Sequence, residues 1–270
     1  MKKSADRKKV FGILVLIVVG LVILYALTEG NELSDAFIPN LIAGFIGSLV
    51  TIFVIDKFLT AEKTRNDKKY TSLAEKRVAL HIRGIQNMFG EIIKSVVIDA
   101  QNLYGVTTYP ELFTEARVSQ LRYFDFKQAP PELTHSSWTD YASNLLKTAE
   151  ERCTQVINSY FMYLDPDLIE SIDKLFSSHI YIYTKNADKI IPLMGTHSPL
   201  IKGFVGYLVP STMLMETFEN LNGITARLQA LNSEISFPLD ANLLHPSVAP
   251  VPGSCRLPVG DIDSPPSAAV

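Results

Sequence analysis

The strongest constraint on this chain is an uncharged apolar run near its N-terminus, Val10–Leu27 (VFGILVLIVVGLVILYAL). Fourteen of its eighteen residues are Leu, Ile, Val or Phe. As a helix with a rise of about 1.5 Å per residue, the run is roughly 27 Å long, close to the ~30 Å thickness of the hydrocarbon core of a bilayer. The sequence therefore predicts a membrane-spanning helix over residues 10–27.

A second apolar run follows at residues 38–55 and is diluted by small residues. Pro39 is expected in its first turn, where the missing N–H of proline is tolerated. The segment between the runs, TEGNELSDA (28–36), is too short to hold a domain. The two runs are therefore expected to form an antiparallel transmembrane hairpin over residues 10–59, with residues 28–36 as the outer loop.

The basic start MKKSADRKK (residues 1–9) also suits a cleaved signal peptide. Against this alternative, the apolar run that follows is longer than the central region of a typical signal peptide. It is also not followed by the A-x-A pattern of a cleavage site. We therefore interpret Val10–Leu27 as a retained span and residues 1–9 as a basic cytoplasmic N-terminus.

The charges that flank the two runs predict their orientation. The basic residues before the first run and after the second are Lys2, Lys3, Arg7, Lys8, Lys9, Lys57, Lys63, Arg65, Lys68 and Lys69. The loop between the runs contains no Lys or Arg. Because cytoplasmic flanks carry the excess of Lys and Arg, we expect a multi-pass protein of the inner (plasma) membrane with both termini in the cytoplasm.

Small and polar residues recur along one face of the second run. They are Asn40, Ala43, Gly44, Gly47, Ser48 and Thr51. Small residues let helix backbones approach closely in lipid, where no hydrophobic effect drives helices together. Counted inward from the outer loop, Gly20 lies at the depth of Gly44 and Gly47, so the hairpin is expected to cross tightly there. The alternative is self-association of the protein through this face, with its polar members lining a narrow aqueous path.

The basic residues after the second run are candidates for lipid contact. They are Lys57, Lys63, Arg65, Lys68 and Lys69, and they begin a segment (57–83) with eight Lys or Arg against three acidic residues. Near a membrane surface, each such residue gains about 1 kcal/mol from anionic headgroups. The alternative is a solvated helix face whose charge only sets the topology.

Beyond the hairpin, the apolar spacing predicts a cytoplasmic helical domain over residues 60–235. Its first helix continues from Asp56 to about Asn102 and carries a seam spaced 4, 3, 4, 3, 4, namely Val78, Ile82, Ile85, Phe89, Ile92 and Val96. This spacing is typical of a bundle helix. Further helices are expected over residues 110–127, 137–164, from 166 onward and from 211 to about 235, and no run alternates as a strand would. The predicted class is all-α.

The sequence makes two further predictions, one for the helix after Asp165 and one for the C-terminal residues. The helix that begins at Pro166, with Asp165 as its N-cap, is expected to bury Leu168, Ile172, Leu175 and His179. The C-terminal residues 236–270 hold seven of the fifteen prolines and little periodicity. This composition predicts a flexible or disordered tail, which is either inert or a partner-binding segment.

Neither the composition nor the motifs point to catalysis. The net charge of −3 does not favour nucleic acid as a partner, and Cys153 and Cys255 lack metal-type spacing, so reduced thiols are expected. The five histidines form no H-E-x-x-H pair. Asp165 and Asp167, with Glu170 and Lys174, superficially match a PD-(D/E)xK nuclease, but helix capping explains them. We expect no enzymatic activity, no cofactor and no metal.

The basic MKKSADRKK start, the paired runs with TEGNELSDA between them and the helical body together resemble a group of small bacterial membrane proteins. These proteins act as effectors in antiphage systems and include the two-span proteins that accompany some retrons. The resemblance implies that the protein damages the inner membrane once its helical domain senses a trigger. The alternative is a membrane-tethered scaffold or regulator whose bundle binds a soluble protein partner, with the spans as an anchor only.

Overall fold

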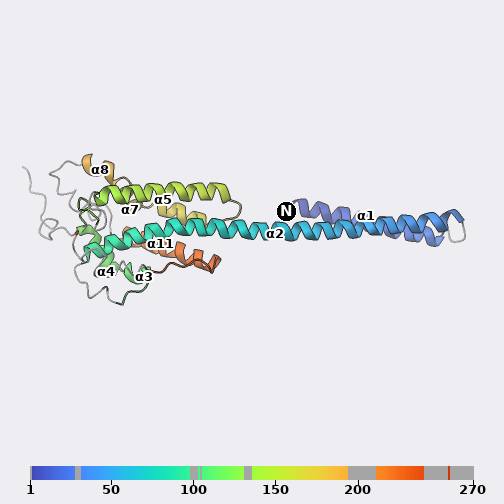
Figure 1. The fold of residues 1–270 in the computed structure, drawn as a ribbon, viewed down its shortest axis with the longest axis horizontal. Helices are drawn as coiled ribbons and strands as arrows, with labels where there is room; N and C mark the ends of the chain where they lie inside the picture. The colour runs from blue at the N-terminus through green and yellow to red at the C-terminus, as the bar shows by residue number, and fades with distance from the viewer. Residues whose placement is uncertain are drawn as a thin grey trace, which may run out of the picture. The chain divides into compact units, whose positions relative to one another are not determined.

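The computed structural model describes residues 2–27, 32–97, 103, 105–130, 136–193, 211–239 and 255. Within these ranges every regular element is a helix and none is a β-strand, which confirms the all-α class. The chain divides into two compact units, Met1–Lys69 and Tyr70–Val270. One helix of 65 residues, α2 (Glu32–Val96), begins in the first unit and ends in the second (Figure 1).

The first unit contains α1 (Lys2–Leu27) and the first part of α2. α1 includes the basic start, whose Lys, Ala and Arg residues are good helix formers. α2 begins at Glu32, so residues 32–36 are helical and differ from the predicted outer loop; residues 28–31 lie outside the described residues. Pro39 is consequently inside the helix instead of in its first turn, which removes one backbone hydrogen bond to the preceding turn.

The last part of α2 is the central helix of the second unit. All six residues of the predicted seam are at most 2% exposed, which confirms the seam. From Ile85 onward, burial extends around most of the helix and includes Met88, Ile93 and Ser95. A helix that is buried on nearly all sides needs partners around it, and the remaining helices of the unit supply them.

Residues 109–123 form three short elements where the sequence predicted one helix over residues 110–127. They are α3 (Tyr109–Leu112), α4 (Glu115–Val118) and the 3₁₀ helix η2 (Ser119–Tyr123). α3 begins with a capping box between Thr108 and Glu111 and ends where Phe113 leaves the helical conformation. Leu112 and Phe113 are neighbours and both are buried. Because α3 ends at Leu112 and α4 begins only at Glu115, the prediction of a single helix over residues 110–127 is wrong.

α5 (Trp138–Tyr160) and α6 (Pro166–Phe176) begin where the sequence predicted helices, and α6 begins after the predicted cap, Asp165. The Ser137 side chain accepts a hydrogen bond from the backbone N–H of Asp140 at 3.2 Å. The Asp165 side chain accepts one from the backbone N–H of Leu168 at 3.1 Å, and Pro166 occupies the first turn. Each cap satisfies an N–H group that the first helical turn leaves without a partner.

The predicted burial of His179 is wrong. Leu168, Ile172 and Leu175 are fully buried as expected, but α6 ends at Phe176 and His179 is the first residue of a new helix, α7 (His179–Lys185). The intervening turn changes the direction of the chain and leaves His179 exposed. α8 (Ala187–Leu193) follows, and both α7 and α8 pack against α5 (Figure 1).

α11 (Ser211–Leu231) completes the bundle by packing against α6. Its inner face buries Leu214, Phe218, Leu221 and Leu228. Leu231 is 42% exposed at the end of the helix. The Phe218 ring stacks edge-on against Phe89 of α2 at 5.2 Å and lies 4.6 Å from Phe113, so aromatic contacts hold these elements together.

The described parts of the predicted C-terminal tail pack on the bundle. The Arg83 guanidinium lies over the Phe237 ring at 5.7 Å and donates to the Ser236 carbonyl. Cys255 is 3% exposed, and its backbone N–H donates to the Ser95 carbonyl at 3.2 Å. The Cys255 thiol sulfur accepts a hydrogen bond from the Trp138 indole at 3.3 Å. The other residues of the predicted tail lie outside the described residues.

Candidate membrane-spanning segment

α2 contains the one helical segment among the described residues that is long and apolar enough to cross a membrane, within Pro39–Val96. No residue of its most apolar stretch is buried. Val50, Phe53 and Val54, for example, are 56%, 50% and 58% exposed. Soluble proteins rarely leave so large a continuous apolar surface in water. The composition and the exposure of this segment are both those of a helix that faces lipid.

A shorter apolar segment in α1, Val15–Leu24, has the same character. Its large side chains are also exposed, with Leu16 at 70% and Ile23 at 55%. The side chains of several other residues in α1 are not described. The described part of α1 is therefore apolar and open, and the second membrane crossing predicted for residues 10–27 stays a prediction.

The predicted close approach of helices at Gly20, Gly44 and Gly47 is not seen among the described residues. A Cβ atom built on any of these glycines meets no heavy atom within 4 Å. Ala43, Ser48, Thr51 and Asn40 are likewise exposed. The small-residue face of α2 is thus open in a single copy of the protein, and its role as a packing or oligomer interface stays a prediction.

The two hydroxyl groups on this face hydrogen-bond to their own helix. Ser48 Oγ donates to the Gly44 carbonyl at 2.9 Å, and Thr51 Oγ1 donates to the Gly47 carbonyl at 2.8 Å. A hydroxyl that donates within its helix leaves no unsatisfied donor in hydrocarbon. This arrangement is compatible with lipid and removes the need for water along the face.

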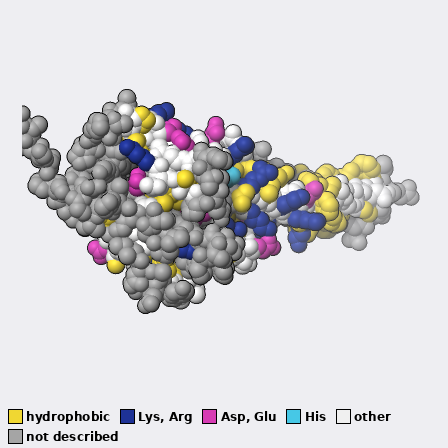
Figure 2. Space-filling view, turned by 60° about the vertical axis from the view of Figure 1, so that its left-hand side comes forward, with side chains coloured by type: hydrophobic (Ala, Val, Ile, Leu, Met, Phe, Trp, Pro, Cys, Tyr) yellow, Lys and Arg dark blue, Asp and Glu magenta, His cyan; other side chains and the backbone are white. Residues whose placement is uncertain are grey.

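The five predicted lipid-facing basic residues, Lys57, Lys63, Arg65, Lys68 and Lys69, are all exposed on α2. Lys57 Nζ lies over the Phe53 ring at 4.8 Å, so this side chain runs back along the apolar segment. Figure 2 shows Lys and Arg side chains gathered on the surface next to apolar patches.

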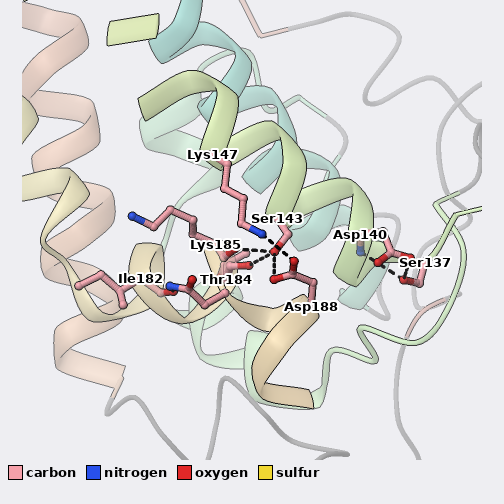
Figure 3. Close-up of polar contacts among 9 residues, drawn as sticks. Ser137, Asp140, Ser143, Lys147, Ile182, Thr184, Lys185 and Asp188 are labelled. Carbon is pink, nitrogen blue, oxygen red and sulfur yellow. Dashed lines mark hydrogen bonds and ion pairs between the residues drawn. The ribbon is translucent and has the colours of Figure 1, made fainter. Parts of the chain in front are cut away.

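The second unit contains a polar cluster of a serine, a lysine and an aspartate, residue types that also occur in catalytic sites (Figure 3). Ser143 Oγ on α5 lies 2.5 Å from the Lys185 carbonyl and 3.0 Å from Asp188 Oδ1. Lys147 Nζ, one turn along α5, donates to Asp188 Oδ2 at 2.6 Å. The hydrogen bond from Lys147 is the main cause that lowers the pKa of Asp188.

The contacts of this cluster connect three helices and leave no reactive group exposed. Ser143 is fully buried and its single proton already has protein acceptors, so the hydroxyl is not presented to a substrate. Asp188 lies in the first turn of α8, where a carboxylate is favoured by the helix dipole. The cluster therefore ties the start of α8 and the end of α7 to α5.

Arg227 of α11 binds both acidic residues at the start of α6, Asp165 and Asp167. Its guanidinium donates to Asp165 Oδ1 at 2.9 Å and to Asp167 Oδ2 at 2.7 Å. Partial desolvation acts to raise the pKa of Asp165, but the hydrogen bonds from Leu168 and Arg227 hold this pKa below its usual value. The pair caps a helix and anchors it to α11, in agreement with the capping interpretation.

The described residues contain no group of three His, Cys, Asp or Glu side chains placed to hold a metal ion. Cys153 is fully buried, and this burial raises the pKa of its thiol to about 12. A thiol with so high a pKa stays protonated and is a poor nucleophile. Of the five histidines, His135, His197 and His245 lie outside the described residues.

Comparisons of the chain with protein-family models, with curated proteins and with solved structures find no match.

Sequence reasoning missed the buried carboxylate Glu75, which is 3% exposed on α2. Burial raises its pKa, the charge of Asp165 adds to this effect, and a hydrogen bond with Asn232 partly offsets it. The Asn232 side chain also donates to Ser72 Oγ at 3.1 Å. The spacing of the seam could have predicted the burial of Glu75, because Glu75 precedes Val78 by three residues and so lies on the same helix face.

Proposed function

We propose that the protein is an integral membrane protein whose second unit is a cytoplasmic sensing or interaction domain. The observation that carries this proposal is the exposed apolar segment of α2, which continues without interruption into the central helix of the bundle. One helix thus serves both as an anchor and as the core of a folded domain. The basic residues from Lys57 to Lys69 lie where a cytoplasmic membrane surface with anionic lipids attracts them.

In this proposal α1 is a second span, and the protein crosses the inner membrane twice. The Lys- and Arg-rich flanks at residues 1–9 and 57–69 are both cytoplasmic, and the loop without basic residues is outside. The bilayer is then the first partner of the protein. A soluble cytoplasmic protein that binds the helical bundle is the second.

Replacing Val50 with Arg tests the anchor. Val50 is 56% exposed in the apolar segment, and an arginine near the centre of a membrane helix costs about 3 kcal/mol of insertion free energy. We expect V50R to reduce the fraction of protein that stays in the membrane after alkaline extraction. N66R, on an exposed position of the same helix beyond the apolar part, is the matched control. Equal retention of V50R and N66R would contradict the anchor.

A second candidate function is that of a membrane-damaging effector, as the resemblance to two-span antiphage proteins implies. The open small-residue face of α2 favours this candidate, because a second copy of the protein can pack there. The hydroxyls of Ser48 and Thr51 are bonded within the helix. Damage would therefore follow from association of helices in the bilayer more readily than from a water-filled path lined by these groups.

Replacing Gly47 with Leu separates the effector from the scaffold. If the protein is an effector, induced expression of the wild type depolarises the cells, as followed with a membrane-potential dye. G47L should then preserve the potential because the larger side chain keeps the helices apart. I46L, which changes a neighbouring side chain on another face, should behave as the wild type. A normal potential with the wild type would favour the scaffold. Equal depolarisation by the wild type and G47L would contradict a role of the small-residue face in the damage.

A further inference from the structure

In the second unit, α2 carries another seam on the side opposite the buried one. Its members are spaced 3, 4, 3 and 4 residues apart and are called here the outer seam, namely Tyr70, Leu73, Arg77, Leu80 and Gly84. Leu80 follows Val78 of the buried seam by two residues, which turns it by about 200° around the helix. The large side chains Tyr70, Leu73 and Leu80 are 44%, 37% and 63% exposed. The outer seam therefore has the spacing of a packed helix face but is open in a single copy.

A groove of about 440 Å³ lies beside the outer seam, between α2 and α5, and both Leu80 and Gly84 line it. A Cβ atom built on Gly84 meets no heavy atom within 4 Å, so this position is a hollow on the surface of α2. Leu80, one turn away, is the most exposed large apolar side chain of residues 70–96. A two-fold axis places the projecting residue of each copy at the hollow of the other, so a face with both features is self-complementary.

The charges around this face do not oppose contact between two copies. Burial lowers the pKa of His81, and the charge of Arg152 adds to this effect, so the imidazole that lines the groove is neutral near pH 7. The Arg77 guanidinium lies over the Tyr160 ring of α5 at 5.8 Å, which leaves its apolar stem on the outer seam. The one carboxylate that lines the groove is Asp140 in the first turn of α5, where the helix dipole favours it.

The function proposed above gives two copies a common orientation. If α2 is anchored in a bilayer, every copy leaves the same side of this bilayer in the same direction, so two outer seams meet in parallel. Alternating steps of 3 and 4 residues suit helices that pack along each other in this way. A contact of about two heptads is small for two free proteins. Anchorage in one membrane strengthens it by raising the effective concentration of the copies.

We propose that the outer seam binds a second copy of this protein, so that two helical bundles pair through α2 with Leu80 of each copy next to Gly84 of the other. The inference rests on the proposed function, because the membrane supplies the parallel orientation. It assigns self-association to the second unit, on a surface distinct from the small-residue face of the apolar segment.

Cysteine cross-linking of the full-length protein in isolated cell membranes tests this contact. Both native cysteines are buried, so the new cysteine of L80C is the main target of a short bis-maleimide. I182C, at a position that is 41% exposed on α7, is the matched control for random collisions. A two-fold contact brings the same residue of both copies together, so L80C should form a covalent dimer in about fivefold higher yield than I182C or more.

Replacing Leu80 with Arg tests the energetics of the contact. L80R should weaken the association of two differently tagged full-length copies about tenfold or more, as measured by energy transfer in liposomes, because each dimer loses two apolar contacts and gains two like charges. I182R is the matched control and should associate as the wild type does. Leu80 is exposed, so the core should stay intact, and far-UV circular dichroism of L80R checks this.

The proposal is overturned if L80C and I182C cross-link equally, or if L80R associates as tightly as I182R. It is also overturned if G47L abolishes the association and L80R leaves it unchanged, since the contact is then in the apolar segment alone. Each of these results leaves the proposed function standing, provided that the wild type stays in the membrane after alkaline extraction. Loss of the wild type from the membrane would contradict the proposed function and, with it, the parallel pairing.

Discussion

Burial controls the ionisation of several side chains in the helical unit. Glu75 and Lys94 are each 3% exposed, and burial raises the pKa of the first and lowers the pKa of the second. Both shifts favour the neutral form, because water stabilises charge better than the interior of a protein does. Cys153 follows the same rule with a pKa of about 12. Desolvation is thus the main cause of the pKa shift at each of these three groups.

Glu75→Gln is expected to stabilise the protein at neutral pH. Because the folded-state pKa of Glu75 is raised, its contribution to stability is fully present below the unfolded-state pKa and is lost as the pH rises through the folded-state value. The amide has no charge to desolvate and can still hydrogen-bond to Asn232. We expect a gain of about 1 kcal/mol, or roughly 2–4 °C in Tm, at pH 7.5 and a smaller gain at pH 5.

Glu234→Gln is the matched control for this prediction. Glu234 pairs with Lys76, and the hydrogen bond from this lysine lowers the pKa of Glu234. Its contribution therefore has the opposite sign and is lost as the pH falls through the folded-state pKa. E234Q should give no gain in Tm at pH 7.5. If E75Q lowers the Tm at pH 7.5, or if its gain is larger at pH 5, the burial argument for Glu75 is wrong.

At the scale of elements, α2 is one helix whose two parts have opposite surfaces. Before Thr60 most of its described apolar side chains are exposed, and after Ile85 they are buried on most sides. Apart from the one bond that Pro39 removes, the backbone hydrogen bonds are made within the helix in both parts, so the same secondary structure suits lipid and a protein core. The sequence signals also differ, with a continuous apolar run in the first part and seam spacing in the second.

Gly223→Ala and Gly105→Ala should have opposite effects. Gly223 lies inside α11 with no atom within 4 Å of an added Cβ, so alanine should stabilise the helix by about 0.5–1 kcal/mol. Gly105 has a φ of +88°, which alanine adopts only with strain. Denaturant unfolding of both variants measures the effects, and stabilisation by G105A would contradict the backbone argument.

The long helices could be predicted from regular apolar spacing and from local caps. Features that depend on tertiary packing could not be predicted from the sequence. Ser137 and Asp165 are local signals, because each cap bonds within its own first turn. The break after Leu112 and the exposure of His179 depend on contacts with other helices, which no local pattern records. In the candidate membrane segment, the residues were predictable from composition. The hydrogen bonds of the Ser48 and Thr51 hydroxyl groups required the structure.

At the scale of the whole molecule, the two units differ in whether their apolar side chains are exposed or buried. The first unit exposes apolar side chains along helices, and the second buries them and ties its surface with ion pairs such as Lys147–Asp188 and Arg227–Asp165. A bilayer resolves this difference, since it removes the exposed apolar surface of one unit from water and leaves the other soluble. We therefore propose that the first unit is embedded in a membrane with its predicted loop outside, and that the second unit is in the cytoplasm.

Cysteine labelling of intact cells tests this claim most directly. The two native cysteines are at most 3% exposed, so labelling of single new cysteines has little background. The new cysteines are Gly30→Cys, in the outer loop predicted from the sequence, and Ser177→Cys, in the exposed turn after α6. A membrane-impermeant maleimide should label G30C on intact cells and should label S177C only after the cells are permeabilised. Labelling of S177C on intact cells, or protection of G30C until permeabilisation, would contradict the account.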